Sequence, residues 1–420
     1  MSVNSGASGP LRARTVPIPD PGNLLDLLPP DGMSWIRRGE GLIAWGIAER
    51  FDGAGPSRYT DANAWWRRVT RHAEVHDDLR LPGTGLLTFG SFAFSDASSL
   101  GGTLMVPRFV VGKRGDQAWL TEISTSSEMP MPTLADALGD PVSVAPLGDV
   151  RIQEGDRETW SRAVSTAVTR IVHGEVDKVV LARAVAAQAS APIDVRAVLR
   201  PLADDYPSCW TFHVDGLVGA TPELLARVDH GLVTSRVLAG TIRPTGDELV
   251  DLAHAAALAR SSKDREEHEY AVRSVSEVLV DHCASINVPE APSVLHLPNV
   301  MHLATDVTGV LNHSATSLEL VSELHPSAAV CGTPTLAAAR VIDELEDLDR
   351  GRYAGPVGWT NAAGDGEWCI GLRSAEISRE DPRHARLFAG CGIVAMSEVD
   401  SEWAESEAKL EPMRKALGAL

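Results

Sequence analysis

The chain has 420 residues, 44% of them hydrophobic, and its 57 acidic and 38 basic side chains give a formal net charge of -19 at pH 7. This length and apolar content are those of a soluble globular protein with a large buried core. The acidic balance disfavours electrostatically driven contact with nucleic acid or an anionic membrane, although a small anion can still bind locally.

The cysteines and the start of the chain carry no sign of export. The five cysteines lie far apart and form no C-x-x-C pair, so the sequence indicates neither a disulfide framework nor a zinc knuckle. The amino-terminal stretch lacks the apolar core of a signal peptide, and no apolar run reaches the roughly 18 residues of a membrane span. We therefore expect reduced thiols and a cytoplasmic protein.

The first part of the chain predicts a loose start followed by strands. Residues 1–22 are rich in glycine, serine and proline and are expected to form a flexible tail. From about 35 to 148, short apolar runs bounded by glycine and proline indicate a strand-rich region. No motif with chemical meaning stands out there.

The rest of the chain combines helices and strands in blocks. A helix is predicted over 158–173, because its apolar residues fall on one face and Gly174 follows as a stop. Helices are also expected at about 248–284 and 399–417, and strands at 210–219, 224–229, 300–310, 353–360, 367–377 and 386–395. Blocks of this kind favour an α+β fold over a doubly wound parallel sheet.

Lys178 interrupts an otherwise apolar strand, VHGEVDKVVLARAV, at residues 172–185. An ammonium group out of water must find a partner or lose its proton. Lys178 is therefore either a structural lysine in a salt bridge or a lysine with a lowered pKa, and the strand pattern leaves both open.

Carboxylates also occur on faces that the pattern turns inward. Asp264 follows Ser261 at the spacing of a capping box, so it is explained as a helix cap. Glu267 precedes apolar residues at helical spacing and projects from the apolar side. Glu223 lies between two expected strands and is either part of a polar turn or a desolvated proton donor.

Glu402, Glu405 and Lys409 share one face of the last expected helix. Such a face is most often solvated. Two helices that each turn a carboxylate inward would instead suit magnesium, which uses one or two carboxylates together with water and an anionic substrate. The spacing alone does not decide between these interpretations, and the histidines show no zinc pattern.

Eight blocks of sequence resemble, in order, those of the chorismate-utilising enzymes, with the greatest likeness to the isochorismate synthases. They fall within residues 158–415, and GSFAF with MVPRFVVGKR looks like the amino-terminal half of the same enzymes. The eight blocks are VDKVVLARAV, FHVDGLVGATPELLARV, VLAGTIRPTGD, SSKDREEHEY, HLATDV, ELHPSAAVCGTP, DRGRYAGPVGWTNAAGDGEWCIGLRSAEI and LFAGCGIVAMSEVDSEWAESEAKL.

The resemblance implies a fold and a reaction. The fold is α+β, with two antiparallel sheets packed face to face and helices outside. It implies a single domain over 23–420, in which 158–415 carries the motifs and 23–150 is a strand-rich amino-terminal half. The reaction is a magnesium-dependent isomerisation of chorismate, which adds water at C2 and expels the 4-hydroxyl group. Its product feeds menaquinone or siderophore biosynthesis.

By this resemblance Lys178 is the general base and Glu223 the general acid. A lysine with its reference pKa of about 10.4 is neutral in only about one molecule in 2,500 at pH 7, so the base needs a depressed pKa. Burial would supply that depression for the lysine, and it would favour the protonated acid for the glutamate. Burial of both groups would then serve catalysis.

The resemblance also implies the ligands of magnesium and of the substrate. Glu267 and Glu405 would ligate Mg²⁺, with Asp264 and Glu402 holding its waters. Tyr353 and Arg373 would bind the enolpyruvyl carboxylate. The remaining pocket residues would be Gly240, Thr241, His302, Gly390, Gly392 and Lys409.

Other members of the family offer alternatives. Aminating relatives generally lack the lysine, and the chain shows no G-x-C-x-G glutaminase nucleophile, so no glutaminase subunit is expected. Salicylate synthases keep the lysine and the glutamate and go on to eliminate pyruvate, and they are the principal alternative. An inactive relative that only binds chorismate is a third reading. The sequence leaves open the pathway and the choice between a monomer and a weak homodimer.

Overall fold

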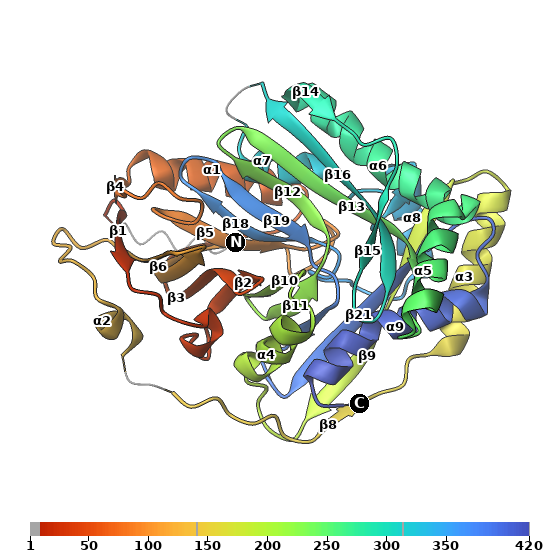
Figure 1. Cartoon of the computed structure of the whole chain (residues 1–420), viewed down its shortest axis with the longest axis horizontal. Helices are drawn as coiled ribbons and strands as arrows, with labels where there is room; N and C mark the ends of the chain where they lie inside the picture. Colours follow the sequence, from red (N-terminus) through yellow and green to blue (C-terminus); the bar gives the residue numbers. More distant parts are fainter. Residues whose placement is uncertain (1–8, 140–141, 313–314, 420) are drawn as a thin grey trace.

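Antiparallel strand pairs dominate the fold. The computed structural model describes residues 9–139, 142–312 and 315–419, which form an α+β arrangement of one hydrogen-bonded network of 21 strands with helices around it (Figure 1). The expected α+β class is therefore confirmed. None of the helices in this described part combines the length and apolar character needed to cross a membrane.

Eight of the described strands precede the one that begins at Lys178, and the last of them, β8, pairs with that strand rather than with the other seven. These eight strands are β1 (Arg12–Ile18), β2 (Met33–Arg37), β3 (Glu40–Gly53), β4 (Glu74–His76), β5 (Leu87–Phe92), β6 (Gly102–Arg114), β7 (Gln117–Ser124) and β8 (Val150–Ile152).

The later strands carry most of the expected site. They are β9 (Lys178–Ala189), β10 (Trp210–Val214), β11 (Leu217–Thr221), β12 (Leu224–Asp229), β13 (Leu232–Ile242), β14 (Cys283–Asn287), β15 (Ser293–His296), β16 (Met301–Leu311), β17 (Gly332–Thr333), β18 (Pro356–Asn361), β19 (Gly366–Ile370), β20 (Ser374–Ile377) and β21 (His384–Ile393).

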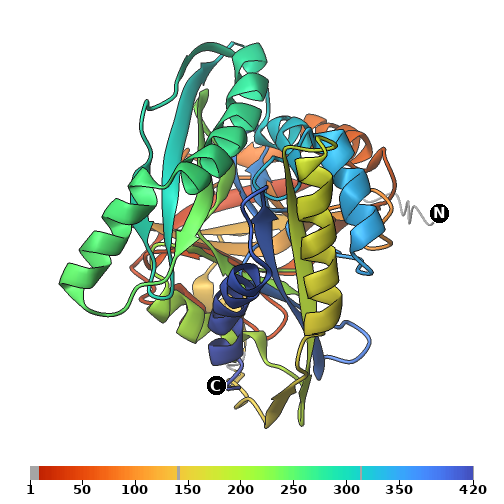
Figure 2. The same ribbon diagram turned by 90° about the vertical axis from the view of Figure 1, so that its right-hand side faces the viewer.

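The helices lie at the outside of the strand network. They are α1 (Arg58–Arg71), α2 (Leu134–Leu138), α3 (Arg157–Val172), α4 (Val195–Asp205), α5 (Glu248–Arg260), α6 (Ser262–His282), α7 (Ser317–Leu324), α8 (Thr335–Leu345) and α9 (Val399–Ala416), with a short 3-10 turn at Leu24–Asp26. Helix α3, in yellow, runs beside β9 in Figure 2.

One expectation for the amino-terminal part is wrong. Residues 12–18, within the expected flexible tail 1–22, form β1, because Ala13 and Val16 are buried and the strand pairs with β7 along its whole length. Residues 1–8 lie outside the described residues. The region from about 35 to 148 is rich in strands as expected, and it also contains α1, which buries Trp65 and Trp66.

The predicted helices of the second part are confirmed in position. Helix α3 ends before Gly174, whose φ of 77° is readily adopted by glycine, although Val172 is 66% exposed rather than packed. The expected helix at 248–284 is divided into α5 and α6 at Ser261, whose side chain accepts a hydrogen bond from the backbone N–H of Asp264 at 3.2 Å. This cap orients the first turn of α6.

The antiparallel pairs form two series. One runs β2–β10–β11–β20–β21–β9 and the other β5–β18–β19–β12–β13–β16. A cluster of buried apolar side chains draws Trp35 and Phe212 from the first series and Phe89 and Trp359 from the second. The expected site residues lie on β9, β13 and β21 and on the segments beside them.

Candidate active site

A cavity lies among β9, β13, β21 and the segments that flank β17 and β18. All eight residues expected to contact the substrate line it, and so do Glu223 and Glu267. These eight are Gly240, Thr241, His302, Tyr353, Arg373, Gly390, Gly392 and Lys409. Residues separated by up to 186 positions in the sequence, from Glu223 to Lys409, therefore surround one space.

Lys178 lies immediately behind this lining. Its side chain is fully buried, and its Nζ is 3.2 Å from Glu267 Oε1, in an ion-pair contact without hydrogen-bond geometry. A Cβ at Gly392 would lie 2.3 Å from Glu267 Oε1 and 3.0 Å from Lys178 Cε. Only glycine at position 392 leaves room for this pair.

Glu223 is buried at the turn between β11 and β12, with 6% of its surface exposed. Burial raises the pKa of Glu223 to about 8, even though the charges of Lys178, Lys409 and Arg373 act to lower it. The carboxyl group is therefore mostly protonated at neutral pH, as a proton donor requires. The alternative of an ordinary solvated turn does not agree with this burial.

Arg373 and His302 fix each other beside the cavity. Arg373 Nη2 lies 2.9 Å from His302 Nε2, and an arginine can only donate, so Nε2 must accept. The ring proton is then on Nδ1, which donates to the carbonyl oxygen of Gly240 at 3.0 Å. Burial and the charge of Arg373 lower the pKa of His302 well below its ordinary value, in agreement with a neutral ring.

Arg373 retains a donor for a ligand. Its backbone has a φ of 48°, its side chain is buried, and its Nη1 has no hydrogen-bond partner among the described residues. A buried guanidinium donor without a partner is costly unless a ligand completes it. A carboxylate would suit the planar fork of this arginine.

Tyr353 and Lys409 complete the polar lining. The ring of Tyr353 stacks on Phe388 with centroids 5.0 Å apart, and burial raises the pKa of Tyr353 to about 12, so the phenol stays protonated. Lys409 Nζ donates to Glu405 Oε1 at 2.5 Å and to the carbonyl oxygen of Gly390 at 2.9 Å. Burial alone would lower the pKa of Lys409, but Glu405 raises it above its ordinary value.

Carboxylates from α6 and α9 are the candidate metal ligands. Oxygen atoms of Glu402 and Glu405 lie within 4.8 Å of each other and of Cys391 Sγ, and Glu402 is only 1% exposed. Burial, followed by the charge of Glu405, raises the pKa of Cys391 well above its ordinary value, so the thiol stays protonated. The donors that remain are carboxylate oxygens, which fit a hard dication such as Mg²⁺.

Asp264 is placed by the close approach of α6 to β13. Gly240 has a φ of +73°, and a Cβ there would lie 2.9 Å from the Cβ of Asp264. Asp264, Glu402 and Glu405 do not themselves line the cavity, whereas Glu267 does. Of the two residues expected to ligate Mg²⁺, Glu267 and Glu405, only Glu267 lines the cavity, whereas Asp264 and Glu402, which were expected to hold its waters, lie outside the lining as Glu405 does.

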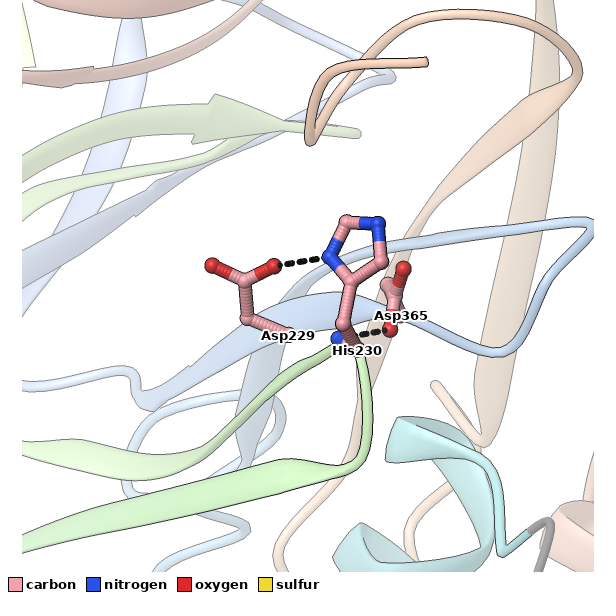
Figure 3. A group of neighbouring side chains, drawn as sticks. All are labelled: Asp229, His230 and Asp365. Carbon is pink, nitrogen blue, oxygen red and sulfur yellow. Dashed lines mark hydrogen bonds and ion pairs between the residues drawn. The ribbon is translucent and has the colours of Figure 1, made fainter.

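A second group with metal-ligand atoms lies in a hairpin turn outside the cavity (Figure 3). His230 Nδ1 contacts Asp229 Oδ1 at 2.6 Å, and its backbone N–H donates to Asp365 Oδ1 at 2.9 Å. These two hydrogen bonds hold the β12–β13 turn in place, so a structural role explains why the three side chains lie together. It contains none of the residues expected from the sequence.

Sequence reasoning missed several residues of the lining. Arg350, Val330, Leu238 and Phe388 all line the cavity. The apolar ones carry no signal that distinguishes them from other core residues. Arg350 had a weak one, because it lies three residues before Tyr353 in the DRGRY block.

Comparisons with known proteins point to one family of enzymes. The model of the chorismate-binding enzyme family matches residues 35–418. The isochorismate synthase MenF of Bacillus subtilis is 32% identical over 393 residues, which cover 86% of this chain and 81% of that protein. The salicylate biosynthesis isochorismate synthase of Pseudomonas aeruginosa is 31% identical over 425 residues, which cover 92% and 84% of the two chains.

A solved structure also resembles the fold over nearly its whole length. It is that of MenF, the menaquinone-specific isochorismate synthase of Escherichia coli, with a TM-score of 0.81 and 26% sequence identity, covering 98% of this chain and 95% of that one. The family match, the two relatives and this structure agree on one assignment. The chain belongs to the chorismate-binding enzyme family.

Proposed function

We propose that the protein is an isochorismate synthase, an isomerase that converts chorismate to isochorismate by adding water at C2 and expelling the 4-hydroxyl group. The observation that carries this proposal is that Glu223 and Arg373 line one cavity and that Lys178 lies directly behind Glu267, another residue of its lining. The names of the two relatives and of the solved structure support it.

The two buried groups suit opposite proton transfers. In the proposed reaction neutral Lys178 takes a proton from the attacking water as its oxygen bonds to C2. Glu223, protonated at neutral pH, gives its proton to the 4-oxygen as the C4–O bond breaks. One water is added and one is released. Lys178 is then an ammonium group and Glu223 a carboxylate. Proton exchange with solvent then restores both groups.

The polar lining suits a substrate with two carboxylates. We assign the enolpyruvyl carboxylate to Arg373 and Tyr353, because Arg373 Nη1 lacks a partner and the Tyr353 phenol remains protonated. His302, held as the tautomer that accepts from Arg373, fixes the direction of the guanidinium fork. Gly390 and Gly392 keep β21 clear of the ring.

Magnesium is the proposed cofactor. Glu267 and Glu405 would ligate the ion, and Glu402 and Asp264 would hold its waters. This assignment is supported by the proximity of Glu402 and Glu405 and by the charges of Glu405, Glu402 and Glu267, which all act on the same Cys391 thiol. When bound, the ion would neutralise the carboxylate on the ring of chorismate. Lys409 contacts Glu405 and balances part of the negative charge of this group.

We also propose the finer description of the fold as two antiparallel sheets packed face to face. Its support is the cluster of buried side chains that draws Trp35 and Phe212 from one series of strands and Phe89 and Trp359 from the other. The proposed reaction needs no glutaminase subunit, because water rather than ammonia attacks the ring.

Product analysis tests the proposed function. Purified protein is incubated with chorismate and Mg²⁺, and the products are separated by chromatography. We expect isochorismate as the main product. Salicylate with an equal amount of pyruvate as the direct main product would replace this proposal by a salicylate synthase, and absence of turnover would leave only a chorismate-binding protein.

A further inference from the structure

The strand that carries Lys178 has an incomplete edge. Strand β21 pairs with one edge of β9 from Val179 to Gln188. On the other edge, β17 pairs only with Lys178 and Val179, and β8 pairs only from Ala187 onward. Among the described residues no strand covers this edge between those two contacts. Buried backbone groups there need other partners.

Side chains replace the missing strand at this edge. The N–H of Val180 donates to the carbonyl oxygen of Cys331 at 2.8 Å. The carbonyl oxygen of Val180 accepts from Arg350 Nη2 at 2.6 Å, and the N–H of Ala182 donates to Glu346 Oε1 at 2.6 Å. An arginine and a glutamate thus supply one donor and one acceptor, as a neighbouring strand would.

Arg350 and Glu346 are locked to each other. Arg350 Nε donates to Glu346 Oε2 at 2.8 Å and Nη2 donates to Oε1 at 2.6 Å, and both side chains are only 3% exposed. Arg350 Nη1 donates in addition to the carbonyl oxygen of Val330 at 2.9 Å, and the guanidinium lies 4.2 Å from the ring centroid of Phe94. The fork of Arg350 therefore has one fixed orientation.

We propose that the Arg350–Glu346 pair is a positioning device for Lys178, a role that rests on the proposed function of that lysine as the base. The pair fixes the backbone of β9 two and four residues after Lys178, and side chains at these alternate positions share one face of the strand. It also fixes Val330, which lines the cavity with Val180. Both Arg350 and Glu346 act through other residues and need not touch the reacting atoms.

The first test is the kinetics of Arg350→Lys. Lysine keeps the charge but cannot bind Glu346, Val180 and Val330 with a planar fork. We expect kcat to fall about 10- to 100-fold through misplacement of the base, while the KM for chorismate changes by less than about threefold. An unchanged kcat, or a loss confined to KM, would overturn the proposal.

Arg196→Lys is the matched control. Arg196 is also a buried arginine that binds a carboxylate, that of Asp194, and two backbone carbonyl oxygens, those of Val142 and Ser143. It does not line the cavity. Thermal melting of both variants measures their stability, and a kcat loss of the same size in Arg196→Lys would show that damage to any buried arginine suffices.

Rescue by an added guanidinium tests the role of the group itself. A second, more open pocket is lined by Glu346 and Arg350 and lies beside the pair, so it offers methylguanidinium a path in Arg350→Ala. We expect added methylguanidinium to restore part of kcat in Arg350→Ala and none in Lys178→Gln. Lack of rescue in a folded Arg350→Ala protein would count against the proposal.

Hydrogen exchange separates this inference from the proposed function. In Arg350→Lys we expect the amides of residues 178–186 to exchange faster than in the wild type, with α4 unchanged. Wild-type protein that fails to convert chorismate would defeat the proposed function, yet exchange would still decide whether the pair fixes β9. Equal exchange in both proteins would overturn the inference. If Arg350→Lys does not fold, Glu346→Gln takes its place in both measurements.

Discussion

The surroundings of Lys178 and Glu223 differ although both side chains are buried at one cavity. Lys178 has Glu267 at 3.2 Å, so its charged form has an anionic neighbour. Glu223 has no ion-pair partner within 4 Å among the described residues, and its pKa is raised to about 8. Burial of Lys178 is therefore accompanied by an anionic contact, whereas burial of Glu223 is accompanied by retention of its proton.

This difference indicates how one cavity can hold a base and an acid. A carboxylate close to Glu223 would raise its pKa further, whereas a cation in direct contact would ionise it and remove the proton that it must donate. Lys178, Lys409 and Arg373 lower the pKa of Glu223, but burial outweighs them. Cations that lie near Glu223 without forming ion pairs are thus compatible with its proposed role.

Removal of Lys178 is expected to have the largest effect. Lys178→Gln keeps a polar side chain of similar length but cannot take a proton, and we expect kcat for isochorismate formation to fall about 10³-fold. Lys415→Gln is the control, since Lys415 is 56% exposed on α9 and pairs with Asp205. If Lys178→Gln kept an activity within tenfold of the wild type, Lys178 would not be the general base.

Glu223→Gln tests the acidic end. Glutamine fills the same volume but is not an acid, so we expect kcat to fall about 10²- to 10³-fold. In the wild type kcat should decrease as pH rises through about 8, because Glu223 then loses the proton that it donates. The same descending limb in the pH profile of Glu223→Gln would assign it to another group.

Arg373→Lys is expected to act mainly on binding. Lysine lacks the planar guanidinium of Arg373. In that group Nη2 contacts His302, and Nη1 is available to a carboxylate. A charged hydrogen bond contributes about 1.5 to 3 kcal/mol, so we expect the KM for chorismate to rise about 10- to 100-fold, with a smaller change in kcat. A large loss of kcat at unchanged KM would contradict this assignment.

Glu223 is also expected to make the stability of the protein depend on pH. Between pH 4.5, the ordinary pKa of the side chain, and about 8, Glu223 is protonated in the folded state and ionised in the unfolded state. The folded state therefore binds more protons, and stability falls as pH rises through this window, by at most roughly 5 kcal/mol. In Glu223→Gln the stability should not show this decrease with rising pH.

Calorimetry of the two proteins measures this difference. We expect the melting temperature of Glu223→Gln relative to that of the wild type to rise by several degrees between pH 5 and pH 8.5. Titration of other groups is shared by both proteins and cancels in the comparison. A constant difference across this range would mean that Glu223 is ionised in the folded protein at neutral pH.

Much of the secondary structure could be predicted from local pattern. Helix α3 and the break at Ser261 follow from periodicity and capping, which depend on residues close in sequence. Helix α1 was missed although its buried Trp65 and Trp66 lie at helical spacing from Ala62. Strand β1 was missed because the glycines and prolines around it hide a short alternation that becomes a strand only against β7.

Some residues of the candidate site could likewise be predicted from the sequence, and others could not. Lys178 was notable in sequence because a charged group in an apolar strand is costly, and the motif blocks gave the other expected positions. Arg350 and Glu346 escaped notice because an arginine and a glutamate four residues apart are ordinary on a solvated helix or loop. Their importance arises from the edge of β9 between its contacts with β17 and β8, which no strand covers in the part of the chain that the structure describes.

The sequence by itself determined the α+β class, the family resemblance and the residue types that the chemistry needs. Periodicity, capping and motif order are properties of the chain that survive without its three-dimensional contacts. Only the tertiary structure decided that Glu223 keeps its proton, that Lys178 contacts Glu267, and that side chains complete the edge of β9. These properties depend on burial and on distances between residues far apart in the chain, which no local pattern encodes.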